Sequence, residues 1–377
     1  MTDPANPLGL NGFEFVEFTS PDPLAMARQF EQLGFVPTHR HLTKNITRYK
    51  QGRINLMLNR DADGRVAQFR NEHGASASAM AFRVADPEAA MKWALENGAK
   101  RTIEDDTVIE GIGGSYLYFI QDGIDLYADW AEIPGWQEAE TKNNVGLDLL
   151  DHLTHNVRRG QMRVWSEFYK TLFGFEEQKY FDIKGQATGL FSQAMIAPDT
   201  AIRIPLNESQ DDKSQIEEFI REYHGEGIQH LALTTPDIFD TVERLRARGV
   251  RLQDTIETYY ELVDKRVPGH GEDLERLRAR GVRLQDTIET YYELVDKRVP
   301  GHGEDLQRLR TNRILIDGNV GDEGILLQIF TENMFGPIFF EIIQRKGNEG
   351  FGNGNFQALF ESIELDQIRR GVIKVDA

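Results

Sequence analysis

Two histidines and one glutamate of this chain have the types and the spacing to hold a transition metal. His152 lies in the stretch DHLTHN, His230 in GIQHLAL and Glu341 in PIFFEIIQR, and each stretch reads as a strand of a buried sheet. Two imidazoles and one carboxylate from three separate strands form a facial triad. Such a triad leaves three positions of an octahedral metal open and suits oxygen chemistry on non-haem Fe(II), although it could also hold Mn or Co.

The spacing of the three residues becomes regular once a tandem repeat is taken into account. Residues 243–274 and 275–306 are the same 32 letters, so the unduplicated length is 377 − 32 = 345 residues. His152 and His230 are 230 − 152 = 78 residues apart. His230 and Glu341 are 341 − 230 = 111 residues apart, or 111 − 32 = 79 without one copy. The near-equal spacing predicts that the three side chains occupy corresponding places in successive modules of the fold.

Each of these residues also has a simpler interpretation. A lone histidine on a strand is more often structural than a metal ligand. Glu341 could be a strand carboxylate paired with Arg345, although its strongly apolar surroundings require a strong partner for a buried charge. His155 lies three residues after His152, so on a strand it faces the opposite side and is expected to be structural or to support a ligand. The first half contributes His39, His41 and His73, which have no matching set.

The elements that would position these residues recur along the chain. Met80–Ala99 and Leu231–Val250 share an alternating strand, an Asp, an amphipathic helix and a Gly suited to a helix C-cap. Phe15–Phe35 and Leu150–Phe175 share a strand, a turn and a helix that ends near a Gly-Phe pair. This pattern predicts an α+β fold of two halves built from βαβββ modules. We expect residues 1–140 to form a non-catalytic half and residues 141–377 the catalytic half.

An alignment of the two halves places a complete ligand set in the second half only. Glu17 stands opposite His152, and Ala79 stands opposite His230. The first half therefore has nothing usable as a pair of ligands. This is the pattern of a duplicated scaffold with one working site.

The perfect repeat differs from the ancient internal duplication. Repeats of solenoid proteins diverge and usually number three or more, whereas here two copies are identical. Each copy carries helical segments, a short strand at Val250–Gln253 in the first copy and a Pro-Gly-His-Gly turn. The fold has room for one copy, so we expect the other to be extruded on the surface, where long insertions are tolerated. The sequence does not decide which copy takes the native place.

The composition excludes several classes of function. A formal net charge of −18 argues against nucleic acid and against anionic membrane surfaces as partners. The chain has no cysteine, which excludes disulfides and thiolate metal sites. A hydrophobic fraction of 40% supports a sizeable core. The first residues, MTDPANPLGL, lack the features of a signal peptide, and no apolar run is long enough to span a membrane. We therefore expect a cytoplasmic protein.

Several longer motifs resemble one known family. DHLTHN, SQIEEF, GEGIQH, LLQIFTE, FFEIIQRKG and GFGNGNFQALFESIE are similar to the bacterial 4-hydroxyphenylpyruvate dioxygenases, members of the vicinal oxygen chelate superfamily. The resemblance covers nearly the whole chain apart from the extra copy. It implies an open, barrel-like sheet in each half, Fe(II) as the only cofactor, and conversion of 4-hydroxyphenylpyruvate, a 2-oxo acid, and O2 to homogentisate and CO2. It also implies a homo-oligomer, either a dimer or a tetramer.

The resemblance also assigns residues around the metal. Fe(II) would be held by His152, His230 and Glu341. The polar group around the aromatic ring of the substrate would be formed by Ser192, Asn207 and Gln215. The residues close to the metal-bound substrate would be Gln229, Gln328 and Phe330. The aromatic wall and the C-terminal lid would include Phe339, Phe351, Asn355 and Phe356, with Gln229, Gln328 and Phe356 at catalytic positions. Plain core packing is the other interpretation of the phenylalanines, and Ser192 and Asn207 could equally be turn residues.

The C-terminal stretch GFGNGNF could suggest a phosphate-binding loop. It lacks the GxGxxG spacing and follows no βαβ unit, so that interpretation is weak. Asn355 is instead a good N-cap for a helix through about Arg370, with Gly371 as its stop. We expect this helix to cover the pocket and to exclude water from it.

Three alternatives to the dioxygenase remain. Hydroxymandelate synthase shares the fold, the triad and the substrate, but has a smaller aliphatic residue at the position of Phe356, so Phe356 favours the ring-hydroxylating enzyme. An extradiol ring-cleaving enzyme is more distant, because its substrate shell fits these motifs poorly. The duplicated segment could also leave a folded but inactive scaffold or an assembly subunit, and competition between the two copies could cause misfolding.

Overall fold

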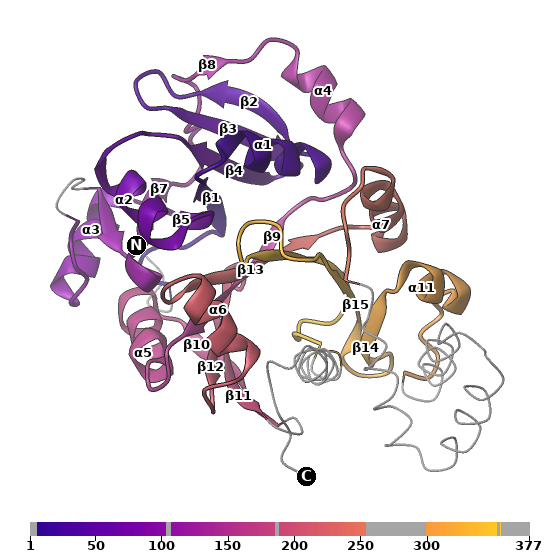
Figure 1. Cartoon of the computed structure of the whole chain (residues 1–377). Helices are drawn as coiled ribbons and strands as arrows, with labels where there is room; N and C mark the ends of the chain where they lie inside the picture. Colours follow the sequence, from indigo (N-terminus) through magenta and orange to yellow (C-terminus); the bar gives the residue numbers. More distant parts are fainter. Residues whose placement is uncertain (1–5, 103–106, 185–187, 254–298, 353–354, 356–377) are drawn as a thin grey trace.

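Two eight-stranded mixed sheets form the framework of the chain (Figure 1). The computed structural model describes residues 6–102, 107–184, 188–253, 299–352 and 355. The first half contains β1 (Phe13–Thr19), α1 (Pro23–Gln32), β2 (Val36–Arg40), β3 (Ile46–Gln51), β4 (Ile54–Asn59), α2 (Gly64–His73), β5 (Ser76–Val84), α3 (Pro87–Glu96), β6 (Val108–Glu110), the short 3-10 helix η1 (Ile112–Gly114), β7 (Tyr116–Gln121), β8 (Ala131–Glu132) and α4 (Trp136–Asn143).

The second half repeats much of this order. It contains β9 (Leu150–Val157), α5 (Met162–Phe173), β10 (Glu176–Lys184), β11 (Gly189–Ile196), β12 (Arg203–Ser209), α6 (Gln215–Glu222), β13 (Gly227–Thr234), α7 (Ile238–Ala247), α11 (Leu306–Asn312), β14 (Leu315–Asn319), β15 (Gly324–Phe330) and β16 (Phe339–Lys346). The α+β fold predicted from the sequence is confirmed.

The strand order shows how the two halves correspond. The first sheet has the order β6-β7-β5-β1-β4-β3-β2-β8, and the second has β10-β11-β12-β9-β13-β16-β15-β14. Read backwards, the second sheet places β9, β13 and β16 where the first has β1, β5 and β7. The parallel pairs also correspond, since β1 pairs with β4 and β9 with β12, while β5 pairs with β7 and β13 with β16. The second sheet curves round an interior space, as Figure 1 shows.

The helix ends follow the capping signals of the sequence. The side chain of Asp86 accepts hydrogen bonds from backbone N–H groups at the start of α3, and Asp237 does the same for α7. Gly98 and Gly249 follow these helices with φ of 96° and 80°. Glycine suits both positions because a side chain there would be strained.

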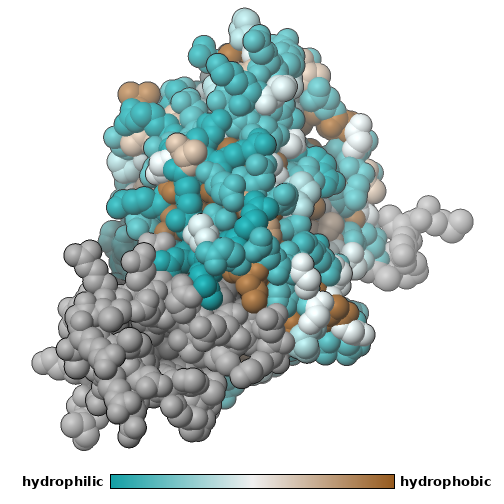
Figure 2. Space-filling model, turned by 90° about the vertical axis from the view of Figure 1, so that its right-hand side faces the viewer, coloured by the Kyte–Doolittle hydropathy of each residue, from teal (hydrophilic) through white to brown (hydrophobic). Residues whose placement is uncertain are grey.

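A continuous apolar core joins the two halves. Phe335 of the second half packs against Phe18 of β1 and Phe30 of α1, with ring centroids 5.4 Å and 5.3 Å away. The ring of His73, at the end of α2, stacks on Tyr223 of the second half at 4.7 Å. On the face shown in Figure 2, hydrophilic side chains predominate and apolar ones are scattered. In the part of the chain that is described, no helix has the length and apolar character that crossing a membrane requires.

The repeat is described only at its outer ends. The first copy contributes the end of α7 and residues up to Gln253, and the second copy contributes residues from Val299 to the start of α11. The strand expected at Val250–Gln253 is reduced to one bridge, in which Leu252 pairs with Thr331. The extruded copy expected from the sequence lies outside the described residues.

His155 of β9 is fully buried and faces away from the interior of the curved sheet, towards α5. Its Nε2 lies 2.7 Å from the hydroxyl of Tyr169 on α5. Burial lowers the pKa of His155 to about 3. As the pH falls below the ordinary histidine pKa, His155 takes up a proton in the unfolded chain but not yet in the folded one. The free energy of unfolding therefore decreases as the pH falls from the ordinary pKa towards the lowered one.

Replacing His155 with glutamine is expected to make the protein less sensitive to acid. The variant keeps a polar partner for Tyr169 but has no titratable ring. As the pH falls below about 6, His155 should lower the free energy of unfolding of the wild type by an amount that approaches about 1.4 kcal/mol per pH unit. Urea unfolding at about pH 7 and about pH 5 measures the slope. Parallel pH dependences of the two proteins would contradict the role given to this histidine.

Candidate metal centre

Three neighbouring strands bring His152, His230 and Glu341 together. Ala232 of β13 lies opposite His152 on the antiparallel strand β9 and opposite Glu341 on the parallel strand β16. His230 precedes Ala232 by two residues, so its side chain is on the same face of the sheet. The near-equal spacing in sequence thus corresponds to three central positions of one sheet.

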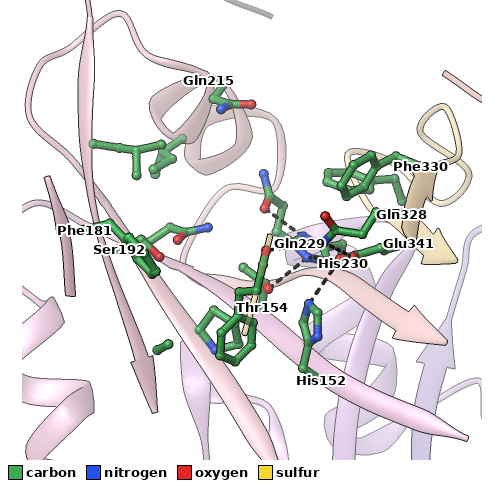
Figure 3. A pocket seen from close by; sticks show the side chains of 17 residues that line it. His152, Thr154, Phe181, Ser192, Gln215, Gln229, His230, Gln328, Phe330 and Glu341 are labelled. Carbon is green, nitrogen blue, oxygen red and sulfur yellow. Dashed lines mark hydrogen bonds and ion pairs between the residues drawn. The ribbon is translucent and has the colours of Figure 1, made fainter. Parts of the chain in front are cut away.

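The donor atoms of these side chains converge on one point. The three ligand atoms all lie within 4.8 Å of one another, and all three residues are buried. Nε2 of His152 is 3.2 Å and Nε2 of His230 is 3.5 Å from the same oxygen, Oε2 of Glu341. In Figure 3 both imidazoles point towards this carboxylate. Two ring nitrogens and a carboxylate oxygen, all aimed inward, fit a divalent transition metal.

The charges of Glu341 and His230 suit metal binding, whereas His152 differs: burial would lower its pKa, but Glu341 and Asp151 raise it. Burial by itself would raise the pKa of Glu341, but the attraction and hydrogen bonding of the two histidines lower it to about 2. Burial lowers the pKa of His230, which favours the neutral ring that a metal needs. The carboxylate is therefore ionised and one imidazole is neutral at physiological pH.

A buried ion pair holds His152 in position from behind. Nδ1 of His152 is 2.9 Å from Oδ1 of Asp151, which leaves Nε2 free to face the centre. Arg345 donates to both carboxylate oxygens of Asp151, each at 2.8 Å. Burial would raise the pKa of Asp151, but the hydrogen bonds from Arg345 and His152 hold it well below its ordinary value. Arg345 is thus the partner of Asp151. The simpler interpretation of the sequence had paired Arg345 with Glu341 instead.

The other two ligands also have hydrogen-bond partners. Oε1 of Gln229 lies 3.2 Å from Nδ1 of His230, and the amide of Gln328 donates to Oε1 of Glu341 at 2.7 Å. The hydroxyl of Thr154 lies 2.9 Å from Nε2 of His230. A metal bound to Nε2 of His230 would replace this hydrogen bond, so the hydroxyl of Thr154 would donate to another acceptor. Partners of this kind fix the orientation of metal ligands.

A cavity opens from the three ligands. It is lined by most of the residues expected around a substrate: Ser192, Asn207, Gln215, Gln229, Gln328, Phe330, Phe339 and Phe351. Figure 3 shows Ser192 on the side opposite the ligands and Gln215 on α6 above the cavity. The ring of Phe351 packs edge-on against His152 at 5.3 Å.

The C-terminal part of the expected site is described only as far as Asn355. This buried side chain donates from Nδ2 to Oε1 of Gln328 at 2.9 Å, which connects the segment to the partner of Glu341. Phe356 and the expected lid helix lie outside the described residues.

Several residues of the site were not anticipated. Thr154 and Phe181 line the cavity, and Asp151 orients His152. The signal for Asp151 was present, because a carboxylate next to a strand histidine in a buried motif requires a cation. Its partner Arg345 is 194 residues away, so the sequence alone did not pair them.

Comparisons with known proteins decide the family. A family model described as hydroxyphenylpyruvate dioxygenase, N-terminal, matches residues 5–131, and one for the glyoxalase/bleomycin resistance protein/dioxygenase superfamily matches residues 149–262. The 4-hydroxyphenylpyruvate dioxygenase of Pseudomonas aeruginosa is 52% identical over 98% of this chain and 97% of its own length. The chain belongs to the 4-hydroxyphenylpyruvate dioxygenase family.

Other relatives of the 4-hydroxyphenylpyruvate dioxygenase family extend the comparison. Hemolysin VllY of Vibrio vulnificus is 49% identical over 99% of both chains. The dioxygenase of Legionella pneumophila strain Corby is 44% identical over 98% of both. A solved mutant of 4-hydroxymandelate synthase from Streptomyces coelicolor has a TM-score of 0.74 at 24% identity, with 96% of this chain and 100% of that chain covered. That last likeness concerns the fold.

Proposed function

We propose that this chain is an Fe(II)-dependent dioxygenase that converts 4-hydroxyphenylpyruvate and O2 to homogentisate and CO2. The observation that carries the proposal is a buried His-His-Glu group that opens directly onto a cavity with aromatic and amide walls. Membership of the 4-hydroxyphenylpyruvate dioxygenase family supports the same reaction.

The residues of the centre would hold the metal and shape its open face. His152, His230 and Glu341 would bind Fe(II) from one side, which leaves the side towards the cavity for ligands. When bound, Fe(II) supplies coordination sites for the 2-oxo acid and O2 and the redox chemistry between them. Gln328 holds Glu341 by a hydrogen bond and lines the cavity, so we assign it a place beside the carboxylate and keto groups of the substrate.

The remainder of the cavity would orient the aromatic ring. Phe330 and Phe339 form an apolar wall of the cavity, with ring centroids 6.1 Å apart. Phe339 also stacks on His230, with ring centroids 4.8 Å apart. Ser192, Asn207 and Gln215 provide polar groups further from the metal ligands, where the ring hydroxyl would lie. Oδ1 of Asn207 is buried and has no hydrogen-bond partner in the part of the chain that is described. A substrate hydroxyl could donate to it.

The test of this function follows oxygen uptake. The Fe(II)-loaded protein should consume O2 when 4-hydroxyphenylpyruvate is added and should release CO2 in a one-to-one ratio to the O2 consumed. A metal-free sample prepared with a chelator should do neither until Fe(II) is returned. Oxygen uptake without CO2 release would exclude the proposed reaction.

Several properties of the whole chain are proposed with this function. We infer a non-catalytic half at residues 1–140, a catalytic half at 141–377, a cytoplasmic location and a homo-oligomer. The described residues of the cavity and the three ligands all lie outside the repeat at 243–306. The duplicated segment is therefore expected to leave the centre intact.

Removing one copy of the repeat is expected to leave catalysis nearly unchanged. Deletion of 243–274 or of 275–306 gives the same 345-residue chain, because the copies are identical. Changes remote from a site usually act independently of it, so Fe(II) affinity and turnover should stay within about threefold of the full chain. Parallel assays of both lengths measure this. An inactive full chain beside an active shortened one would show that the duplication leaves an inactive scaffold.

A further inference from the structure

The first half has a cavity of its own at the place that corresponds to the metal centre. It has a volume of about 250 Å³, and Glu17, Asn59 and Ser78 lie among its lining residues. These three side chains come from β1, β4 and β5, which correspond to β9, β12 and β13 around the metal centre. Helix α2 lies beside β5 and contributes the lining residues Arg65, Val66 and Phe69, as α6 contributes Gln215 and Ile216 in the second half.

This cavity does not have the ligands for a metal. The sequence alignment set Glu17 opposite His152, but the strand register differs. Ala81 pairs with Phe15 as Ala232 pairs with His152, so Phe15 takes the place of His152. Glu17 pairs with Ala79 as Thr154 pairs with His230, so Ala79 takes the place of His230. Ala81 pairs with Tyr118 as Ala232 pairs with Glu341, so a phenol stands where the carboxylate would be. Among the described residues, the one group suited to a metal is that of the second half.

The inner part of the cavity carries a buried carboxyl without a cation. Glu17 is 7% exposed. One of its oxygens accepts from the hydroxyl of Ser78 at 2.9 Å and the other from the amide of Asn59 at 3.2 Å. Both donors are neutral, and Glu17 has no ion pair with any described residue. Burial raises the pKa of Glu17, and the hydrogen bonds from Ser78 and Asn59 and the charge of Lys44 offset this only in part. A carboxylate held in this way is stabilised by a positive charge.

The walls and the mouth of the cavity suit a small organic cation. Phe69, Tyr116 and Tyr118 line it, and the guanidinium of Arg65 already lies over the rings of Phe69 and Tyr116, 4.9 Å and 5.8 Å from their centroids. The faces of aromatic rings attract cations, and we assign the ring of Tyr118 to the ammonium group of a ligand. The lining also includes two acidic and two basic side chains, those of Asp61, Asp63, Lys44 and Arg65, so these four charges balance. The volume lies just below the roughly 300 Å³ at which sites for small molecules begin, which limits the ligand to about the size of one amino acid.

We propose that this cavity binds a small organic ammonium ion, with Glu17 as its counter-ion and the ring of Tyr118 as part of its wall. The ammonium group donates to the carboxylate oxygens of Glu17, which Ser78 and Asn59 hold in place. The binding is independent of the metal centre and of the reaction proposed for it.

The test compares two probes of similar size on the iron-loaded protein. Phenethylamine carries an ammonium group, and 3-phenylpropionate carries a carboxylate on the same skeleton. Ligand-detected NMR titrations should show phenethylamine binding to the wild type and at least about tenfold weaker binding to Glu17→Gln, a change that a buried charge pair readily exceeds. Glu138→Gln, which alters an exposed carboxylate of α4, is the matched control and should bind as the wild type does.

A second variant keeps the test valid if Glu17→Gln does not fold. Tyr118→Leu keeps the carboxyl and removes one aromatic wall, so it should also weaken phenethylamine binding. Binding of 3-phenylpropionate should not depend on Glu17, and turnover of the iron-loaded variants should stay at the wild-type level. The proposal is overturned if phenethylamine does not bind at millimolar concentration, or if its affinity is the same in the wild type and in the variant that folds.

Discussion

His152→Ala is expected to abolish Fe(II) binding at stoichiometric concentrations and to stop turnover of 4-hydroxyphenylpyruvate. The imidazole supplies one of three donor atoms that lie within 4.8 Å of one another, and no described histidine besides His152 and His230 belongs to this group. Loss of a partner behind a ligand typically weakens metal binding about 10–100-fold, so loss of the ligand itself should exceed about 100-fold. Turnover should fall by more than about 10³, equivalent to about 4 kcal/mol of activation free energy.

An anaerobic Fe(II) titration and a turnover assay measure these effects, with circular dichroism to confirm that the variant folds. His224→Asn is the matched control. His224 is exposed and has a φ of 60°, a conformation that asparagine tolerates well. The control should bind Fe(II) and turn over substrate like the wild type. Undiminished iron binding in His152→Ala would remove this residue from the metal centre.

Asp151→Asn is expected to weaken Fe(II) binding by about 10–100-fold without removing any ligand. The substitution is nearly isosteric, but it takes away the charge that receives a hydrogen bond from His152 and two from Arg345. Arg345 also donates to the backbone oxygens of Asn348 and Gly350, at 3.0 Å and 2.5 Å. Those residues lead directly to Phe351, so the variant should also raise KM for the substrate.

A spectroscopic measurement separates this positioning role from a general loss of stability. The visible absorption of bound Co(II) reports the geometry of the ligands, and it should change in Asp151→Asn even when the site is saturated. Asp212→Asn is the control, because Asp212 pairs with Arg159 from a side chain that is 89% exposed. Its Co(II) spectrum and Fe(II) affinity should stay close to those of the wild type. Equal affinities and spectra for all three proteins would show that Asp151 does not orient His152.

The sequence was informative where short patterns determine local structure. Asp86 and Asp237 cap their helices as the pattern of strand, Asp, helix and Gly predicts, since capping depends on neighbours only two or three residues away. The ligand candidates could be found because the modules of the fold repeat along the chain. Residues that are one module apart in sequence therefore occupy equivalent positions. Removal of one copy of the repeat was essential, because only the corrected spacing points to Glu341.

The sequence was less informative about contacts between distant segments. The pair of Asp151 and Arg345 joins β9 to β16, whereas the simpler interpretation of Glu341 had paired it with the nearby Arg345. The same limit applies to Glu17, which the alignment treated as a place without a usable site. Its partners Asn59 and Ser78 come from two other strands, and only the folded sheet brings them together. The expected strand at Val250–Gln253 became a single bridge, because pairing there depends on Thr331 far along the chain.

The central claim is tested most directly by the identity of the product. The protein loaded with Fe(II) is supplied with O2 and 4-hydroxyphenylpyruvate, and the product is separated by chromatography and identified by its mass and retention. We expect homogentisate, in an amount equal to the CO2 released. 4-Hydroxymandelate would assign the chain to benzylic oxidation instead, and bound iron without any product would contradict the proposed activity.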